Sequence, residues 1–101
     1  MSRRREAGIP SDIRRRCLIS GRVQMVGFRM FATHHGQRLR LRGWARNLPT
    51  GEVEILVEGP PAAVAEFLKL LRRGPAPAEV SSFVVSEEAS GVPLHQFGSA
   101  V

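Results

Sequence analysis

The chain of 101 residues has one cysteine, one tryptophan, no tyrosine and no long run of apolar residues. A single cysteine cannot form an intramolecular disulfide, and Cys17 lies in an apolar run, so we interpret it as a small buried side chain. No run approaches the roughly 20 apolar residues of a membrane-spanning helix. The polar, arginine-rich N-terminus does not resemble a signal peptide. These absences predict a cytoplasmic protein that has no membrane partner.

Acidic residues are fewer than basic ones. The chain has 9 Asp and Glu residues and 15 Lys and Arg residues, which gives a formal net charge of +6. Much of this charge comes from arginines near the start of the chain, namely Arg3, Arg4, Arg5, Arg14, Arg15 and Arg16. Residues 1–13 contain few apolar side chains, which predicts a disordered basic tail ahead of a single domain over residues 14–101. We interpret the tail as solubilising, and a nucleic-acid-binding arm is the alternative.

Hydrophobic periodicity predicts strands at residues 17–23, 42–48, 52–58 and 80–86. Apolar residues at helical spacing predict helices over residues 28–39 and 60–73. Gly74 is expected to cap the second helix in a left-handed conformation, and Gly36 within the first helix indicates a close approach to the sheet. A short final strand, anchored by Leu94 and Phe97, could lie within residues 93–101.

The strand at residues 52–58 alternates clearly between two faces. Its buried face is expected to consist of Val53, Ile55 and Val57. Its opposite face is interpreted as solvated, and it holds Glu52, Glu54 and Glu58. The element order βαββαβ is typical of the ferredoxin-like α+β fold, in which two helices cover one face of an antiparallel sheet. This fold serves many functions, so it does not identify one.

The segment from Gly21 to Arg29 joins an apolar strand to a helix through a loop that contains glycine. Consecutive backbone N–H groups from Gln24 to Phe28, close to a helix N-terminus, form a concavity that suits an anion. The planar guanidinium of Arg29 can bind two oxygens of a phosphoryl group. The segment therefore predicts a site for a small tetrahedral anion.

Three motifs resemble those of the acylphosphatase family, and the likeness extends over roughly residues 14–98. They are Gly21-Arg22-Val23-Gln24-Met25-Val26-Gly27-Phe28-Arg29, Gly43-Trp44-Ala45-Arg46-Asn47 and Gly51-Glu52-Val53-Glu54. The resemblance implies a βαββαβ fold and hydrolysis of the carboxyl–phosphate bond of acyl phosphates to a carboxylate and inorganic phosphate. It implies that the enzyme uses no metal, no other cofactor and no covalent intermediate. We expect a monomer for which inorganic phosphate or sulfate competes with the substrate.

The resemblance also implies roles for individual residues. Arg29 is the catalytic arginine that binds phosphate, and Asn47 orients the attacking water. An asparagine suits this task because it offers a donor and an acceptor without titrating. The phosphate-binding set is expected to comprise Gln24, Met25, Val26, Gly27, Phe28 and Arg29.

Two residues depart from the family pattern, because Met25 and Arg40 stand where glycine is common in the family. If position 25 requires a positive φ, its Cβ costs about 1–2 kcal/mol. We expect Met25 to change the rate rather than abolish activity. Arg40 is expected to shift the end of the first helix only slightly.

Two alternative functions use the same fold. One is a nucleic-acid-binding module, although the chain has no tyrosine, its third strand carries glutamates, and RNA-recognition domains stack bases on aromatic side chains. The other is a phosphate-binding descendant of the enzyme without turnover. His34 and His35 are adjacent, so we expect them on different sides of the helix, where they form no metal site. Trp44 is expected to serve packing.

Overall fold

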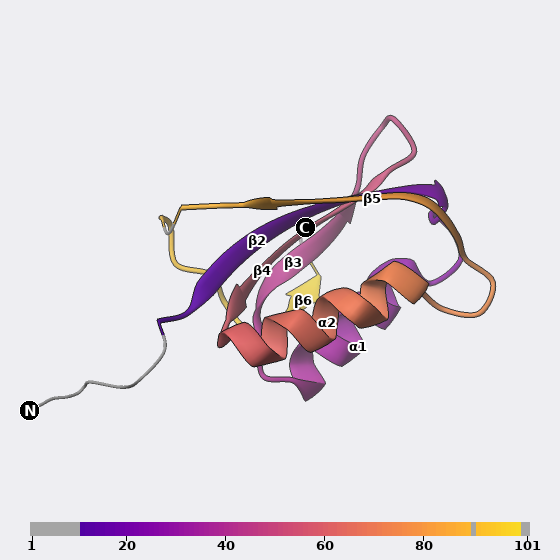
Figure 1. The fold of residues 1–101 in the computed structure, drawn as a ribbon. Helices are drawn as coiled ribbons and strands as arrows, with labels where there is room; N and C mark the ends of the chain where they lie inside the picture. The colour runs from indigo at the N-terminus through magenta and orange to yellow at the C-terminus, as the bar shows by residue number, and fades with distance from the viewer. Residues whose placement is uncertain (1–10, 90, 100–101) are drawn as a thin grey trace, which may run out of the picture.

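The structure is a computed structural model that describes residues 11–89 and 91–99. Along the chain it contains β2 (Ile13–Arg22), α1 (Phe28–Arg38), β3 (Arg42–Asn47), β4 (Val53–Gly59), α2 (Pro61–Arg73), β5 (Glu79–Glu87) and β6 (Gly98–Ser99) (Figure 1). The predicted βαββαβ order is confirmed. The short final strand is present as well, at Gly98–Ser99, just after Phe97.

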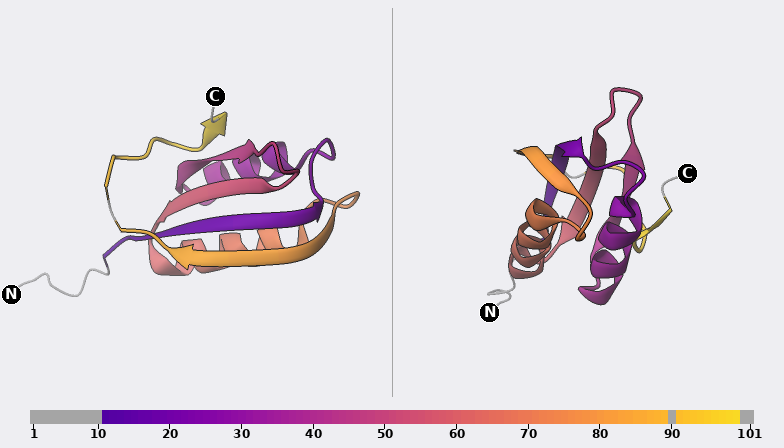
Figure 2. Two further views of the ribbon diagram at one scale, coloured as in Figure 1. Left: turned by 90° about the horizontal axis from the view of Figure 1, so that it is seen from above. Right: turned by 90° about the vertical axis from the view of Figure 1, so that its right-hand side faces the viewer.

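The strands form one sheet in the order β5-β2-β4-β3-β6. Strand β2 pairs antiparallel with both β4 and β5, and β3 pairs antiparallel with β4. Strand β6 is parallel to β3, so the predicted four-stranded antiparallel sheet gains a short parallel strand at its edge. Both helices cover the same face, as the right-hand view of Figure 2 shows. This arrangement is the ferredoxin-like α+β fold that the sequence predicts.

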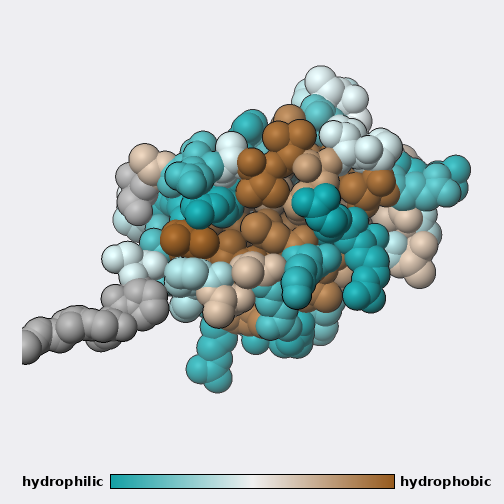
Figure 3. All heavy atoms as spheres, viewed as in Figure 1, coloured by the Kyte–Doolittle hydropathy of each residue, from teal (hydrophilic) through white to brown (hydrophobic). Residues whose placement is uncertain are grey.

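The core lies between the helices and the sheet face that they cover. The strands contribute Cys17, Ile19, Ala45, Val53, Ile55 and Val57, and the helices contribute Phe28, Ala32, Val64, Phe67 and Leu71. Burial raises the pKa of the Cys17 thiol to about 12, so this side chain is a neutral thiol, as its apolar context predicts. Apolar side chains also gather along the edge strand β5 and between it and α2 (Figure 3), where Val84 and Val85 remain exposed.

The end of α1 shows why two unusual residues occupy their positions. A Cβ on Gly36 would lie 2.6 Å from the ring of Phe97, so the close approach predicted for Gly36 is to the C-terminal segment and not to the sheet itself. The helix ends where the Leu41 N–H donates to the Gly36 carbonyl at 2.8 Å, with Arg40 at φ 58° between them. Arg40 therefore takes the left-handed conformation itself. At the end of α2, Gly74 has φ 73° but ψ 177°, which lies outside the left-handed helical region predicted for it.

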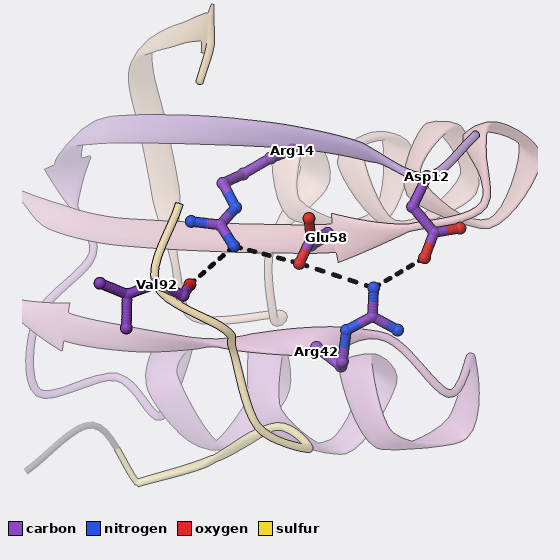
Figure 4. Close-up of polar contacts among 5 residues, drawn as sticks. All are labelled: Asp12, Arg14, Arg42, Glu58 and Val92. Carbon is purple, nitrogen blue, oxygen red and sulfur yellow. Dashed lines mark hydrogen bonds and ion pairs between the residues drawn. The ribbon is translucent and has the colours of Figure 1, made fainter. Parts of the chain in front are cut away.

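The sheet face without helices carries ion pairs rather than the solvated glutamates that the alternation predicts. Glu54 is 3% exposed and Glu58 is 8% exposed. Each lies between two arginines, because the register places β4 between β2 and β3. The Nη2 atom of Arg14 lies 3.2 Å from Glu58 Oε1, and that of Arg42 lies 3.5 Å from it (Figure 4). A buried carboxylate requires such partners, since burial of an unpaired charge is costly.

Glu54, four residues before Glu58 in β4, also lies between two arginines, although Arg16 on β2 is diagonal to it in the register. Its carboxylate accepts from Arg46 Nε at 2.6 Å and is also paired with Arg16. Arg14, Arg15 and Arg16, which precede the strand predicted at residues 17–23, therefore belong to β2. Arg14 also donates to the Val92 carbonyl at 2.9 Å and so ties the C-terminal segment to the sheet (Figure 4).

The boundary between tail and domain is described only in part. Residues 1–10, which carry Arg3, Arg4 and Arg5, lie outside the described residues. Strand β2 begins at Ile13, which is paired with Gly59, and Asp12 accepts from Arg42 Nη2 at 2.7 Å. Pairing with the sheet thus begins one residue before the predicted domain start.

Candidate active site

The loop between β2 and α1 has a backbone that turns twice through the left-handed region. Met25 has φ 63°, and Gly27, the N-cap of α1, has φ 81° and ψ 18°. Residues in this region turn successive N–H groups toward a common side, which makes a concavity for an anion. Position 25 therefore has the positive φ at which a Cβ is costly, and Met25 carries a Cβ where glycine would be unstrained.

The N–H groups of this loop form no backbone hydrogen bond of good geometry within the described part of the chain. None of the backbone hydrogen bonds found there uses an N–H group of residues 24–28 as donor, and no side chain caps α1. The first turn of α1 contains no acidic residue. Because the partial positive charge of a helix lies at its N-terminus, these groups can bind an anion without first releasing a protein acceptor.

Apolar side chains anchor the loop to the hydrophobic core. Val23 and Phe28, at its two ends, are each 1% exposed, and Val26 packs against the same core. Met25 is 99% exposed and makes no comparable contact. The core thus holds the loop backbone through its apolar side chains.

Arg29 and Asn47 reach the loop from two different elements. Arg29 lies in the first turn of α1 and is exposed, and it forms no ion pair with a carboxylate of residues 11–89 or 91–99. Asn47 is the last residue of β3, where it is paired with Val53. The two line a single cavity of about 170 Å³, together with Val23, Met25, Gly27, Phe28 and Met30. A cavity of this size suits a phosphoryl group, since sites for drug-sized ligands measure roughly 300–1,000 Å³.

Five of the predicted site residues therefore meet at one cavity: Met25, Gly27, Phe28, Arg29 and Asn47. Gln24 and Val26 do not line it. Val26 supports the loop from the core side. Gln24 has a different place, which the sequence does not reveal.

The side chain of Gln24 ties the loop to the β3–β4 hairpin. Its Nε2 donates to the carbonyl oxygens of Leu48 and Glu52, each at 2.9 Å. Leu48 directly follows Asn47, so this pair of hydrogen bonds fixes the distance between the anion-binding loop and the asparagine. The only signal in the sequence is a polar residue beside an apolar strand, and its partners depend on the tertiary fold.

A second cavity adjoins the first and has no counterpart in the sequence predictions. It measures about 420 Å³ and is lined by Arg29, Met30, Thr33, His34, Gln37 and Ala45. Arg29 and Met30 belong to both cavities. The helical spacing of residues 30, 33, 34 and 37 could have indicated one exposed stripe, but not what faces it.

The paired histidines lie closer together than predicted, because their ring centroids are 4.9 Å apart. His35 also packs against Phe31 at 4.6 Å and accepts from Arg38 Nε at 3.3 Å. Burial lowers the pKa of His35, and the positive charge of Arg38 lowers it further. Within residues 11–89 and 91–99, no group of three or more His, Cys, Asp or Glu side chains is placed to hold a metal ion.

Trp44 contacts Arg46, whose guanidinium carbon lies 4.9 Å from the ring centroid, in keeping with a packing role. This contact belongs to the sheet face without helices.

Among the helices that the structure describes, none is both long and apolar enough to cross a membrane.

Comparisons with known proteins agree with this geometry. The model of the Acylphosphatase family matches residues 15–98. An acylphosphatase of Moorella thermoacetica is 47% identical over 92 residues, which cover 90% of this chain and 99% of the relative. One from Caldivirga maquilingensis is 49% identical over 83 residues, covering 81% and 86%. The crystal structure of acylphosphatase from Bacillus subtilis superposes with a TM-score of 0.83 at 35% identity, covering 88% of this chain and 99% of that one. The chain therefore belongs to the acylphosphatase family and is an enzyme of that family.

Proposed function

We propose that the chain hydrolyses acyl phosphates with three groups: the loop N–H donors, Arg29 and Asn47. The observation that carries the proposal is the single cavity of about 170 Å³ that Arg29, Asn47 and the glycine loop line together. Binding of the phosphoryl group and delivery of water thus have candidate residues in the lining of one small cavity.

The phosphoryl group binds at the loop. Its oxygens accept from the N–H groups of residues 24–28, which donate to no other described residue. The guanidinium of Arg29 binds two further oxygen positions in a bidentate manner. The core holds the loop backbone in place, and together with Arg29 its N–H groups stabilise the charge that develops on the equatorial oxygens in the transition state.

Asn47 orients the water. Its amide holds one water molecule in line with the bond between phosphorus and the acyl oxygen. The water oxygen attacks phosphorus, the bond to the acyl oxygen breaks, and its electron pair leaves with the carboxylate. One water proton passes to a phosphate oxygen or to solvent. Because the carboxylate is a good leaving group, the reaction requires no metal, no other cofactor and no covalent intermediate.

The proposal includes the expected partners. An acyl phosphate is the substrate, and inorganic phosphate or sulfate competes for the same donors. We propose that the enzyme acts as a monomer. Nucleic acid is not a proposed partner, since four arginines on the sheet face without helices already form ion pairs with Glu54 and Glu58 of β4.

The test measures phosphate release from benzoyl phosphate in the presence of EDTA. We expect turnover by the wild type and its loss in Arg29→Ala. The matched control is Arg38→Ala, which removes an exposed arginine from the other end of α1, where it is 3.8 Å from Glu66. Activity that disappears with EDTA contradicts the metal-independent mechanism.

Two further outcomes favour the alternatives. Phosphate binding without any turnover favours a non-catalytic phosphate-binding module. Salt-sensitive RNA binding that is lost when residues 1–10 are deleted favours a nucleic-acid-binding module.

A further inference from the structure

The second cavity continues directly from the proposed phosphoryl site. Arg29 and Met30 line both cavities, and the opposite wall is Ala45 of β3, two residues before Asn47. The helical wall extends from Arg29 to Gln37, a length of about 12 Å at 1.5 Å per residue. This length accommodates an acyl group that projects from a phosphoryl group bound at the loop.

The smaller cavity leaves little space for the acyl group. Its volume of about 170 Å³ is shared by the phosphoryl group and the attacking water, whereas the adjoining cavity measures about 420 Å³. Arg29 lies at the junction. An acyl chain that leaves the phosphoryl site on the side of Arg29 and Met30 therefore enters this groove.

The walls of the groove change from apolar to polar along α1. Met30 is 78% exposed, and its flexible thioether can pack against an aromatic ring or an alkyl chain. Thr33 and His34 follow one turn later and offer a hydroxyl and an imidazole. Gln37 closes the far end, where its Nε2 donates to the Phe97 carbonyl at 2.7 Å.

Charge distinguishes this groove further. No carboxylate belongs to its described lining, which contains the guanidinium of Arg29 and the imidazole of His34. The acidic residue that forms an ion pair with α1 is Glu66, and its partner there is Arg38. A negative group at the far end of a ligand would thus meet hydrogen-bond donors without a like charge in the lining.

We propose that this groove, lined by Met30, Thr33, His34 and Ala45, is the acyl subsite, and that it favours acyl phosphates bearing a second carboxylate. The substrate class is therefore the monophosphates of dicarboxylic acids. The carbon skeleton packs against Met30 and Ala45, and the distal carboxylate accepts from Thr33 and His34. This inference rests on the proposed function, because it assumes that the phosphoryl group binds at the loop.

The test compares two substrates of the same shape, 4-carboxybenzoyl phosphate and 4-methylbenzoyl phosphate. We expect kcat/KM of the wild type to favour the carboxylate by about fivefold to tenfold, as for one or two hydrogen bonds to a charged group at an exposed site. His34→Ala should remove this preference and Thr33→Val should reduce it, while kcat/KM for the methyl compound stays within about twofold. His35→Ala is the control, because its ring packs against Phe31 and does not line the groove.

A binding measurement separates the subsite from the chemistry. The probes are (4-carboxybenzoyl)methylphosphonate and (4-methylbenzoyl)methylphosphonate, which cannot be hydrolysed, titrated calorimetrically into the wild type and His34→Ala. Tighter binding of the carboxylate by the wild type alone supports the subsite, even if no acyl phosphate is hydrolysed and the proposed function fails. Equal affinities of the wild type for the two probes, or a preference for the carboxylate that His34→Ala retains in full, overturn it.

Discussion

Met25 offers a sharp test of how the loop stores strain. The substitution Met25→Gly removes a Cβ from a residue at φ 63° whose side chain is 99% exposed. A residue with a Cβ costs about 1–2 kcal/mol in the left-handed region. Glycine makes the unfolded chain more flexible, which costs about 0.4–1 kcal/mol. Since the exposed side chain buries almost no area, the balance is a gain of up to about 1.5 kcal/mol in the free energy of unfolding.

The same change should leave turnover similar or raise it. A glycine keeps the left-handed conformation, so the loop N–H groups retain their direction, and the entrance of the cavity loses a bulky side chain. The matched control is Met25→Ala, which shortens the side chain but keeps the strained Cβ. It should change the free energy of unfolding by less than about 0.5 kcal/mol, as is usual for exposed positions.

The assays are urea denaturation and steady-state hydrolysis of benzoyl phosphate, applied to all three proteins. If Met25→Gly is less stable than Met25→Ala, the strain argument is wrong. A large loss of kcat/KM in Met25→Gly, with the fold intact, would show that the Met25 side chain contacts the substrate.

Three further predictions concern the Gln24 hydrogen bonds, the buried Cys17 thiol and the contact between Gly36 and Phe97. Gln24→Ala should lower kcat/KM about tenfold or more, because the loop loses its hydrogen bonds to the β3–β4 hairpin. The control is Ser20→Ala, which removes a hydrogen bond of 3.1 Å to the Glu52 carboxylate and should change kcat/KM less than about twofold. Equal effects of the two substitutions contradict a positioning role for Gln24. Cys17 should resist thiol reagents in the native state and react in guanidinium. The pKa of Cys17 rises from 9.0 to about 12 on folding, because burial favours the neutral thiol. Its contribution to the free energy of unfolding is therefore complete below pH 9 and should decline toward pH 12. A free energy of unfolding that stays constant from pH 9 to pH 12 contradicts the burial of Cys17. Gly36→Ala should destabilise the protein by about 1–3 kcal/mol in thermal or urea denaturation, since its Cβ would lie 2.6 Å from the Phe97 ring, and an unchanged midpoint refutes that contact.

Local patterns predict most of this fold because each element buries one face. The alternation of Val53, Ile55 and Val57 identifies β4, and all three side chains are fully buried. The helical spacing of apolar residues that begins at Phe28, directly after Gly27, likewise predicts the helix start, and Gly27 is the N-cap of α1. Such signals arise within a few residues of sequence.

The parts that the sequence does not predict depend on partners far along the chain. The alternation in β4 places Glu58 on the sheet face that is expected to be solvated. Only the register, which puts Glu58 opposite Arg14 and Arg42, makes it a buried member of an ion-pair cluster. The contacts of Gln24 with the hairpin have the same origin. The cavity that Arg29 and Asn47 share and the groove beyond it both depend on how α1 lies against β3.

The central claim is that the loop with Arg29 binds the phosphoryl group while Asn47 supplies the water. The most direct measurement combines calorimetric binding of inorganic phosphate with kcat for benzoyl phosphate in the wild type, Arg29→Ala and Asn47→Ala. We predict that Asn47→Ala binds phosphate within about threefold of the wild type but loses at least about a hundredfold in kcat, while Arg29→Ala loses both. Full phosphate affinity in Arg29→Ala, or full kcat in Asn47→Ala, would contradict this division of roles.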